Sequence, residues 1–529
     1  MCGFHKRGQS LISVSEIQKT EKTENTHKLD LDLSIEEDET HTTGQKRNLT
    51  MVYLLFLAEA IMSASLSSHI AILVPSETDC LSTDTAFLRS ILQVAYYFGS
   101  AMGLFWGRAA DKFGRRRIAL VGLAGMSTCC ISMGFATRFP AFAMLRCFAG
   151  AVSSATTISG LAMLADLTQG SKARTKIVAR LPVIAVCGNI GPLTAHMWHN
   201  AFDGRLFEAF AKYPGLSGQL ACGGLVFSIA VAEALLLEDT LPSRNRKQND
   251  CEGDADCEKA AFLGQSLSND SNDSISITII EALNDDAAAP LPSRIGVAQL
   301  LTAPTVLLLL TSFSLLSLHA STFDILLPHI GYNGGTGVPC SWLHPIATVV
   351  TALAAIRIYR LVPWIVGRVG LLTMYRRTSI AFPVLYTAVP LVALLVNATG
   401  ASPIISGIVS TIALFFKTTL AGAAYVLVLL LVLSAAPDAY STGTVLGVVS
   451  ISELFKALAV GASGISYYLS DDYSLVIVNG FLWAALSVTA VIGIRITWKL
   501  REIPRVGTDI PQECFVWEGM FDSESEDGR

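Results

Sequence analysis

The chain has 529 residues, of which 51% are hydrophobic and only 15% are charged. Soluble proteins carry about 25% charged residues, so this composition argues against a soluble protein and favours a membrane protein. The formal net charge of −5 is small and gives no reason to expect nucleic-acid binding. The 11 cysteines follow no metal-binding spacing, so we expect neither a metal nor a bound cofactor.

The apolar runs, taken in chain order, predict twelve membrane-spanning helices. Residues 1–48 are polar without an early apolar run, so we expect a disordered cytoplasmic tail and no cleavable signal peptide. Each later run has the roughly 20 residues that a crossing of the hydrocarbon core requires. The predicted spans are 50–74, 86–107, 117–137, 140–166, 176–199, 217–237, 303–328, 344–366, 378–397, 404–433, 442–469 and 474–497.

These spans divide the chain into two halves of six helices. We expect the halves at 49–238 and 301–498, joined by a polar cytoplasmic loop at 239–300 and followed by a cytoplasmic tail at 499–529. The fold class is therefore an all-α membrane protein. Because the basic residues gather in alternate loops, the positive-inside rule places both termini in the cytoplasm. The sequence does not choose between the plasma membrane and the vacuolar membrane.

The loop between the second and third predicted spans contains an ordered motif. It reads Gly-Arg-Ala-Ala-Asp-Lys-Phe-Gly-Arg-Arg-Arg from Gly107. Gly107 permits a close approach of neighbouring helices, and Gly114 permits a tight turn. Asp111 can interact with a helix N-terminus, while Arg115 and Arg116 stay at the cytoplasmic face. A basic anchor of the ordinary positive-inside kind is the alternative interpretation.

The motif is similar to the signature loop of the major facilitator superfamily of secondary transporters, G-x-x-x-D-[RK]-x-G-R-[RK]. Arg146 and Gly150 resemble the R-x-x-x-G pattern of the family's fourth helix, which here closes with Asp166. The resemblance implies that family's fold, with two six-helix pseudo-repeats around a central cavity, and transport by alternating access. We expect Asp111, Arg115 and Asp166 to form a charge cluster that closes the inner gate.

The fifth span resembles part of the motif that is associated with antiporters. Gly188, Gly191 and Pro192 match the pattern, but Ala195 and His196 replace the glycine pair that should follow. A second copy of the loop signature, at 367–377, lacks the aspartate.

Three short runs resemble the fungal twelve-helix drug:proton antiporters within the superfamily. The runs are Leu57-Ala58-Glu59-Ala60, Leu237-Glu238-Asp239-Thr240-Leu241-Pro242 and Gly443-Thr444-Val445-Leu446-Gly447.

Ionisable residues inside the predicted spans are candidates for a proton and substrate site, because each costs insertion free energy. Glu59 and Arg146 are expected to line the cavity and to pair directly or through water. One interpretation makes Glu59 a proton carrier that Arg146 and the substrate switch. The other makes the two a permanent ion pair that holds the first half together.

The second half contributes further charges. Glu453 and Lys456 are three residues apart on one helical face, so they can neutralise each other. Lys417 has no partner within its own span, and we expect it to meet Glu453 or to attract an anionic group of the substrate. His319 and Asp324 are predicted to be polar residues at the mouth of the cavity.

Two features are predicted on the non-cytoplasmic side. Cys80 and Cys340 fall in loops on that side, where a disulfide is chemically feasible. Asn397 begins a sequon there and is a candidate for glycosylation, although it lies close to the bilayer.

The predicted function is secondary active transport rather than enzymatic catalysis. No phosphate-binding loop of the form G-x-x-x-x-G-K-[ST] is present, so a proton gradient is the expected energy source. We expect proton-coupled efflux of a small, moderately hydrophobic molecule such as a drug or secondary metabolite. A symporter or uniporter for nutrient uptake, and a ligand sensor that transports nothing, are the alternatives. The expected partners are the substrate and the lipid bilayer, and the expected state is a monomer.

Overall fold

The structure is a computed structural model in which every regular element of the described residues is a helix. It describes residues 43–73, 83–168, 171–189, 213, 215–240, 300–301, 304–333, 340–399, 403–436, 441–470 and 475–500. The chain divides into two compact units, Met1–Thr50 and Met51–Arg529. The described part of the first unit is the beginning of α2 (Thr43–Leu73), and the second unit contains the rest of α2 and all other helices.

The helices fall into two groups along the chain, which we call the first and second halves. The first half contains α2, α3 (Thr83–Ser100), α4 (Gly103–Phe113), α5 (Arg115–Gly134), α6 (Phe139–Leu167), α7 (Ser171–Val178), α8 (Leu181–Cys187) and α11 (Leu216–Leu236). The second half contains α16 (Pro304–Asn333), α17 (Cys340–Val369), α18 (Leu371–Ala398), α19 (Pro403–Ser434), α20 (Thr442–Val449), α21 (Ser452–Ser470) and α22 (Leu475–Lys499).

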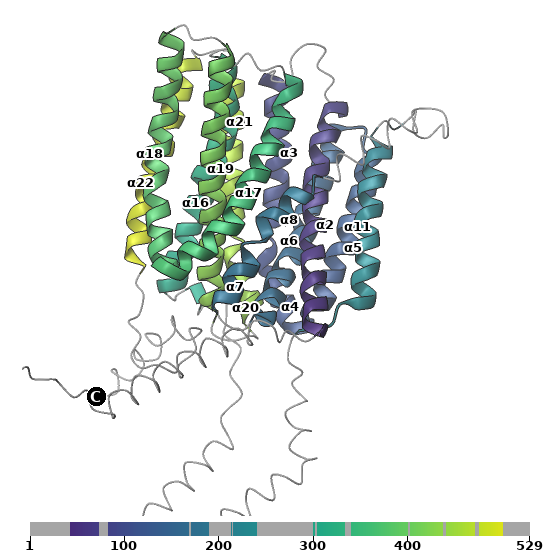
Figure 1. Ribbon diagram of the computed structural model, residues 1–529. Helices are drawn as coiled ribbons and strands as arrows, with labels where there is room; N and C mark the ends of the chain where they lie inside the picture. The colour runs from purple at the N-terminus through teal and green to yellow at the C-terminus, as the bar shows by residue number, and fades with distance from the viewer. Residues whose placement is uncertain are drawn as a thin grey trace, which may run out of the picture. The chain divides into compact units, whose positions relative to one another are not determined.

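Among the described residues, nine helical segments are long and apolar enough to cross a membrane. Large apolar side chains such as Leu235 and Phe481 remain exposed on them, as expected for helices that face lipid rather than water. The three other predicted spans coincide with α3 and α4, with α7 and α8, and with α18. In the second unit, the long helices run alongside one another (Figure 1).

Three of the spans that we predicted as single helices are broken. The second span is interrupted at Ala101 and Met102 between α3 and α4, and the eleventh at Ser450 and Ile451 between α20 and α21. The fifth is interrupted between α7 and α8, where Pro182 stands at the second position of α8 and lacks a backbone donor. Proline and clusters of glycine and serine are the usual causes of such kinks.

The two halves meet through pairs of helices. Within the second unit, α4 packs against α20, α3 against α21, and both α7 and α8 against α17. Figure 1 shows α4, α7 and α20 at the same end of this unit, which is the lower end in that view. The breaks therefore produce short helices at that end, and these helices pack against helices of the other half.

Two glycines reveal the internal repeat. Gly114 joins α4 to α5 with φ of 98°, and Gly370 joins α17 to α18 with φ of 90°. Both lie in the left-handed region, which favours glycine. A Cβ atom on Gly114 would lie 2.4 Å from Oδ2 of Asp239, whereas no described residue lies within 4 Å of one on Gly370. The second copy of the motif thus keeps the turn but lacks the residue that packs against it.

Candidate functional site

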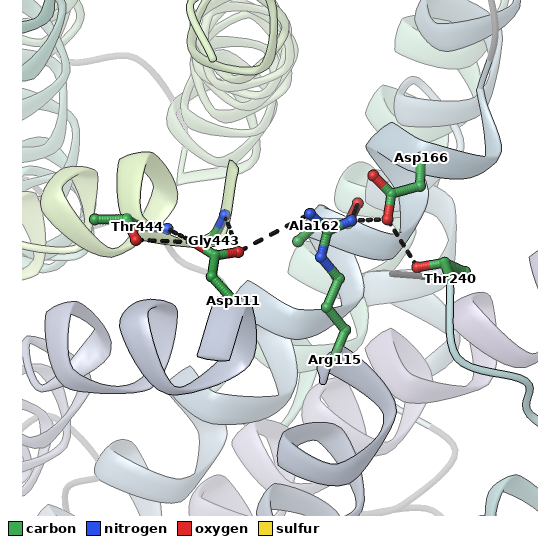
Figure 2. Close-up of polar contacts among 7 residues, drawn as sticks. All are labelled: Asp111, Arg115, Ala162, Asp166, Thr240, Gly443 and Thr444. Atoms are coloured by element: carbon green, nitrogen blue, oxygen red, sulfur yellow. Dashed lines mark hydrogen bonds and ion pairs between the residues drawn. The ribbon is translucent and has the colours of Figure 1, made fainter. Parts of the chain in front are cut away.

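The motif aspartate caps a helix of the opposite half. Asp111 at the end of α4 faces the first turn of α20 (Figure 2). Its Oδ1 accepts a hydrogen bond from the Gly443 amide at 3.0 Å, and its Oδ2 accepts from the Thr444 amide and hydroxyl at 2.7 and 2.8 Å. The first amides of a helix lack partners and carry partial positive charge, so a buried carboxylate is stabilised there. Asp111 is 7% exposed.

The motif arginine joins this aspartate to the end of α6. Arg115 is fully buried and forms an ion pair with Asp166. Its Nη2 lies 3.9 Å from Oδ1 of Asp111, and its Nη1 donates to the Ala162 carbonyl at 2.9 Å. The hydroxyl of Thr240 donates to Oδ2 of Asp166 at 2.8 Å (Figure 2). We call Asp111, Arg115 and Asp166 the motif cluster, and the structure brings the three together as expected.

Arg116 makes a separate contact. Its Nη2 donates to the Ala234 carbonyl at 2.7 Å, in the last turn of α11. A cation near a helix C-terminus complements the partial negative charge of its free carbonyls. Arg116 therefore holds the end of α11 beside the motif and does not enter the motif cluster.

Glycines allow α4 and α20 to touch. A Cβ atom on Gly107 would lie 2.1 Å from the Gly443 carbonyl oxygen, and one on Gly447 would lie 2.9 Å from the Gly103 carbonyl oxygen. Two helices that approach this closely tolerate only hydrogen at these positions. The expectation of close packing at Gly107 thus has a specific partner on the opposite half.

Two further motif glycines bring helices of the first half together. A Cβ atom on Gly150 of α6 would lie 2.0 Å from the Tyr96 carbonyl oxygen on α3. One on Gly188, just after α8, would lie 2.4 Å from the Cβ of Ala60 on α2. The first contact is at Tyr96 and the second is next to Glu59, two residues whose side chains are in contact with each other.

Glu59 of α2 is bound by two hydroxyl groups. The Tyr96 hydroxyl lies 2.9 Å from Oε1 of Glu59 and 2.9 Å from Oγ of Ser153. The Ser153 hydroxyl also reaches Glu59 Oε1, at 3.4 Å. Hydroxyl donors stabilise an ionised carboxylate and can accept from a protonated one, so this arrangement suits either state of Glu59. We call Glu59, Tyr96 and Ser153 the Glu59 centre.

Arg146 does not pair directly with Glu59, which was one of the two arrangements that we expected. The fully buried guanidinium lies over the Tyr96 ring, with Cζ 4.6 Å from the ring centroid. Within the described part of the chain its three nitrogens have no hydrogen-bond partner and no ion pair. Tyr96 therefore stands between the two charges, with its ring against the arginine and its hydroxyl on the glutamate. A cation–π contact offsets only part of the cost of burying this charge.

Glu453 and Lys456 pair within α21, as their spacing indicates. The lysine Nζ lies 2.6 Å from Glu453 Oε1. It also lies 5.7 Å from the ring centroid of Tyr97 on α3 and 5.4 Å from that of Tyr425 on α19. The pair is mostly buried and touches both halves. The tyrosines were not singled out from the sequence, because ring residues in spans are common and their spacing gives no signal.

Lys417 is paired with Asp324 and not with Glu453. Its ammonium group is buried, forms an ion pair with Asp324 of α16, and lies 5.6 Å from the Phe323 ring centroid. Asp324 is 56% exposed, which agrees with a residue at a mouth. His319 was wrongly placed at the mouth: it is buried, and its Nδ1 lies 2.7 Å from the Tyr386 hydroxyl. The two residues are only five positions apart on α16, but they lie in different environments.

Several predicted features lie outside the described residues. These include Cys80, Gly191, Pro192, the side chains of Cys340 and Asn397, residues 1–42 and 501–529 of the tails, and the loop from 241 to 299. Residues 43–48, which we expected to belong to a disordered tail, instead form the beginning of α2. Asn397 itself stands in the last turn of α18.

The fold and the motif cluster together define a helical membrane protein of two halves, which contact each other at the motif between α4 and α5. A model of the Major Facilitator Superfamily matches residues 51–461. The chain belongs to this superfamily, whose members are transporters.

Among curated proteins, the chain is 24% identical over 470 residues to the multidrug transporter mfsB of Aspergillus fumigatus, covering 76% of this chain and 74% of the relative. It is 22% identical over 463 residues to the transporter psiT2 of Psilocybe cyanescens, covering 79% and 82%. A shorter match of 158 residues, 23% identical, links it to the efflux pump azaK of Aspergillus niger, with 30% and 32% covered.

Solved structures share the fold at low identity. The human organic anion transporter MFSD10 (TETRAN) matches with a TM-score of 0.60 and 15% identity, covering 86% of this chain and all of that one. The proton:xylose symporter XylE matches with a TM-score of 0.58 and 15% identity, covering 89% and 98%. At this identity the similarity establishes the architecture alone.

Proposed function

We propose that this transporter exports a small, moderately hydrophobic molecule in exchange for protons. The names of the fungal relatives, a multidrug transporter and an efflux pump, support the direction of transport. The Glu59 centre is the observation that carries the proton coupling. It is a membrane-embedded carboxyl group with hydroxyl partners, close to Arg146, a cation that has no ion pair among the described residues.

Glu59 has the contacts that a proton carrier needs. When the carboxylate is ionised, it accepts from the Tyr96 and Ser153 hydroxyls; when it is protonated, it can donate to one of them. Arg146 lies against the ring of Tyr96, whose hydroxyl contacts Glu59, and a nearby positive charge favours the ionised form of a carboxyl group. A movement of Tyr96 would change how strongly the two charges interact. Proton binding and the packing of α2, α3 and α6 are therefore linked.

The motif cluster supports alternating access. It joins α4 to α20 through Asp111 and joins α5 to α6 through Arg115 and Asp166. In this arrangement the halves are in contact at the motif end. Release of Asp111 from the amides of Gly443 and Thr444 would let the halves separate at that end. The closed and open conformations would then expose the substrate site to opposite sides of the membrane in turn. The expected cytoplasmic location of the motif makes this the closed inner gate.

The test is proton flux in liposomes that contain the full chain and an internal pH-sensitive dye. A panel of hydrophobic cations, neutral compounds and weak acids is added outside, and Glu59→Gln is compared with wild type. Glu233→Gln serves as the matched control, since it makes the same chemical change at a buried carboxyl group outside the Glu59 centre.

Substrate-driven proton movement in the direction opposite to the substrate, lost in Glu59→Gln and kept in Glu233→Gln, would establish antiport through Glu59. Movement in the same direction would replace the proposal with symport. Substrate flux without protons would indicate a uniporter, and binding without flux would indicate a sensor.

A further inference from the structure

We infer that Glu453, Tyr97 and Tyr425 form a binding site for an organic ammonium group, which the amine of Lys456 occupies in this conformation. The inference rests on the proposed function and narrows the substrate class to hydrophobic amines and quaternary ammonium compounds. We call the three residues the ammonium site.

The contacts of Lys456 are those by which proteins recognise a foreign cation. One carboxylate oxygen lies 2.6 Å from the amine, and two tyrosine ring centroids lie 5.7 and 5.4 Å from it. Each ring is within the roughly 6 Å over which a ring face attracts a cation, and the combination of a carboxylate with aromatic rings is characteristic of ammonium recognition. The side chains of Lys456 and Glu453 are 19% and 20% exposed, so solvent screens these contacts only weakly.

The lysine is suited to be a temporary occupant. It stands three residues from Glu453 on the same helix, on a flexible four-carbon stem that can swing away without any change in the backbone. Glu453 and both rings stay in place when it leaves. A substrate ammonium that took the position of the amine would restore the same ion pair and the same ring contacts.

The ammonium site is built from both halves. Tyr97 belongs to α3 of the first half, whereas Tyr425 belongs to α19 and Glu453 to α21 of the second. Since α3 packs against α21, a rocking movement between the halves separates Tyr97 from the other two residues. A bound ammonium group therefore interacts differently with the two conformations, which is the condition for a ligand to drive the change.

Two other interpretations of the same contacts make different predictions. If Lys456 itself bound the substrate, the preferred ligand would carry a carboxylate, and Tyr97 and Tyr425 would contribute little. If the Glu453–Lys456 pair were purely structural, ligand charge would not matter. Because Lys456 competes with the substrate only in our proposal, removal of its amine separates the three interpretations.

The experiment is equilibrium binding to the purified full chain in lipid nanodiscs. Three probes with the same phenylalkyl chain end in a trimethylammonium, a hydroxyl or a carboxylate group, so they differ only in the head group, which is cationic, neutral or anionic. The quaternary group keeps its charge at every pH. The variants are Lys456→Met, Glu453→Gln, the double variant of both, and Phe or Leu at Tyr97 and Tyr425, each checked for monodispersity and thermal stability.

We expect wild type to prefer the trimethylammonium probe. Lys456→Met, which removes the internal competitor, should bind that probe about tenfold more tightly. Glu453→Gln should bind it at least tenfold more weakly. The double variant, which leaves neither charge of the pair behind, should show the same loss. Leucine at either tyrosine should weaken binding, while phenylalanine, which keeps the ring face, should preserve it.

A preference for the carboxylate probe, or weaker ammonium binding by Lys456→Met, would overturn the proposal. Equal binding by the leucine and phenylalanine variants would also overturn it. Binding requires neither flux nor protons, so ammonium binding without proton exchange would leave the ammonium site standing and remove the proposed antiport. Proton exchange driven only by neutral compounds would support the antiport and remove the ammonium site.

Discussion

Oδ2 of Asp111 accepts hydrogen bonds from both the backbone amide and the hydroxyl of Thr444, a residue 333 positions away in the opposite half of the chain. Each hydrogen bond to a charged acceptor contributes about 1.5–3 kcal/mol in a buried setting. A handful of such contacts is therefore enough to decide which conformation of a transporter is populated.

Asp111→Asn should shift the conformational equilibrium toward opening at the motif end. The amide keeps an acceptor oxygen but loses the charge that the amides of Gly443 and Thr444 stabilise. We expect transport in liposomes to fall at least tenfold while the protein remains folded, corresponding to about 1.4 kcal/mol. Labelling of a cysteine introduced between α4 and α20 reports the opening. Normal transport by this variant would exclude a gating role.

Gly107→Ala should separate α4 from α20. Its Cβ atom would lie 2.1 Å from the Gly443 carbonyl oxygen, so the two helices have to move apart. Gly367→Ala is the matched control, because it adds the same methyl group to a helical glycine of the second half that has no described residue within 4 Å of its Cβ position. We expect loss of crosslinking across α4 and α20, and reduced transport, in the first variant alone. Equal behaviour of both variants would contradict the packing argument.

Tyr96→Phe and Tyr96→Leu should distinguish the role of the Tyr96 hydroxyl from that of its ring. Phenylalanine removes the hydroxyl on Glu59 but keeps the ring beneath Arg146, whereas leucine removes both. Without the hydroxyl the ionised form of Glu59 loses a donor, so proton release should require a higher pH and the pH profile of proton-coupled transport should move upward. Leucine should also lower the thermal stability. An unchanged pH profile in Tyr96→Phe would remove Tyr96 from the coupling.

Glu233→Gln should make the protein more stable. Glu233 on α11 is 0% exposed, and within the described residues neither carboxylate oxygen has a hydrogen-bond partner. Burying an uncompensated carboxyl group costs about 1–3 kcal/mol, part of which a neutral amide avoids. We expect a rise of about 2–4 °C in the Tm measured by tryptophan fluorescence. A lower Tm in Glu233→Gln would indicate a functional partner for the carboxyl group.

The sequence predicted elements well where local chemistry decides them. Long apolar runs indicated the spans, and the motif indicated a tight turn at Gly114 and a helix N-terminus as the partner of Asp111. It did not indicate which helix, since Thr444 stands in a different half. The breaks at Ala101 and at Ser450 were also missed, because hydropathy continues across them.

Pairings between distant side chains were predicted poorly. Lys417 was assigned to Glu453 or a substrate, but its partner is Asp324, a choice that depends on the rotation of α16 against α19. The position of His319 was predicted wrongly for a similar reason. It lies five residues before the exposed Asp324 on the same helix, but it faces the interior. Local spacing did succeed for Glu453 and Lys456, where both partners share one helix.

The residues directly after α11 attach the start of the central segment to the motif. Asp239 packs against Gly114, and the hydroxyl of Thr240 is bonded to Asp166, the ion-pair partner of Arg115. A displacement of the chain at residue 240 would therefore act on the motif arginine through the Thr240–Asp166 hydrogen bond and the Asp166–Arg115 ion pair. A molecule that binds the segment after residue 240 would therefore affect the motif, and through it transport, without contacting the membrane-spanning helices.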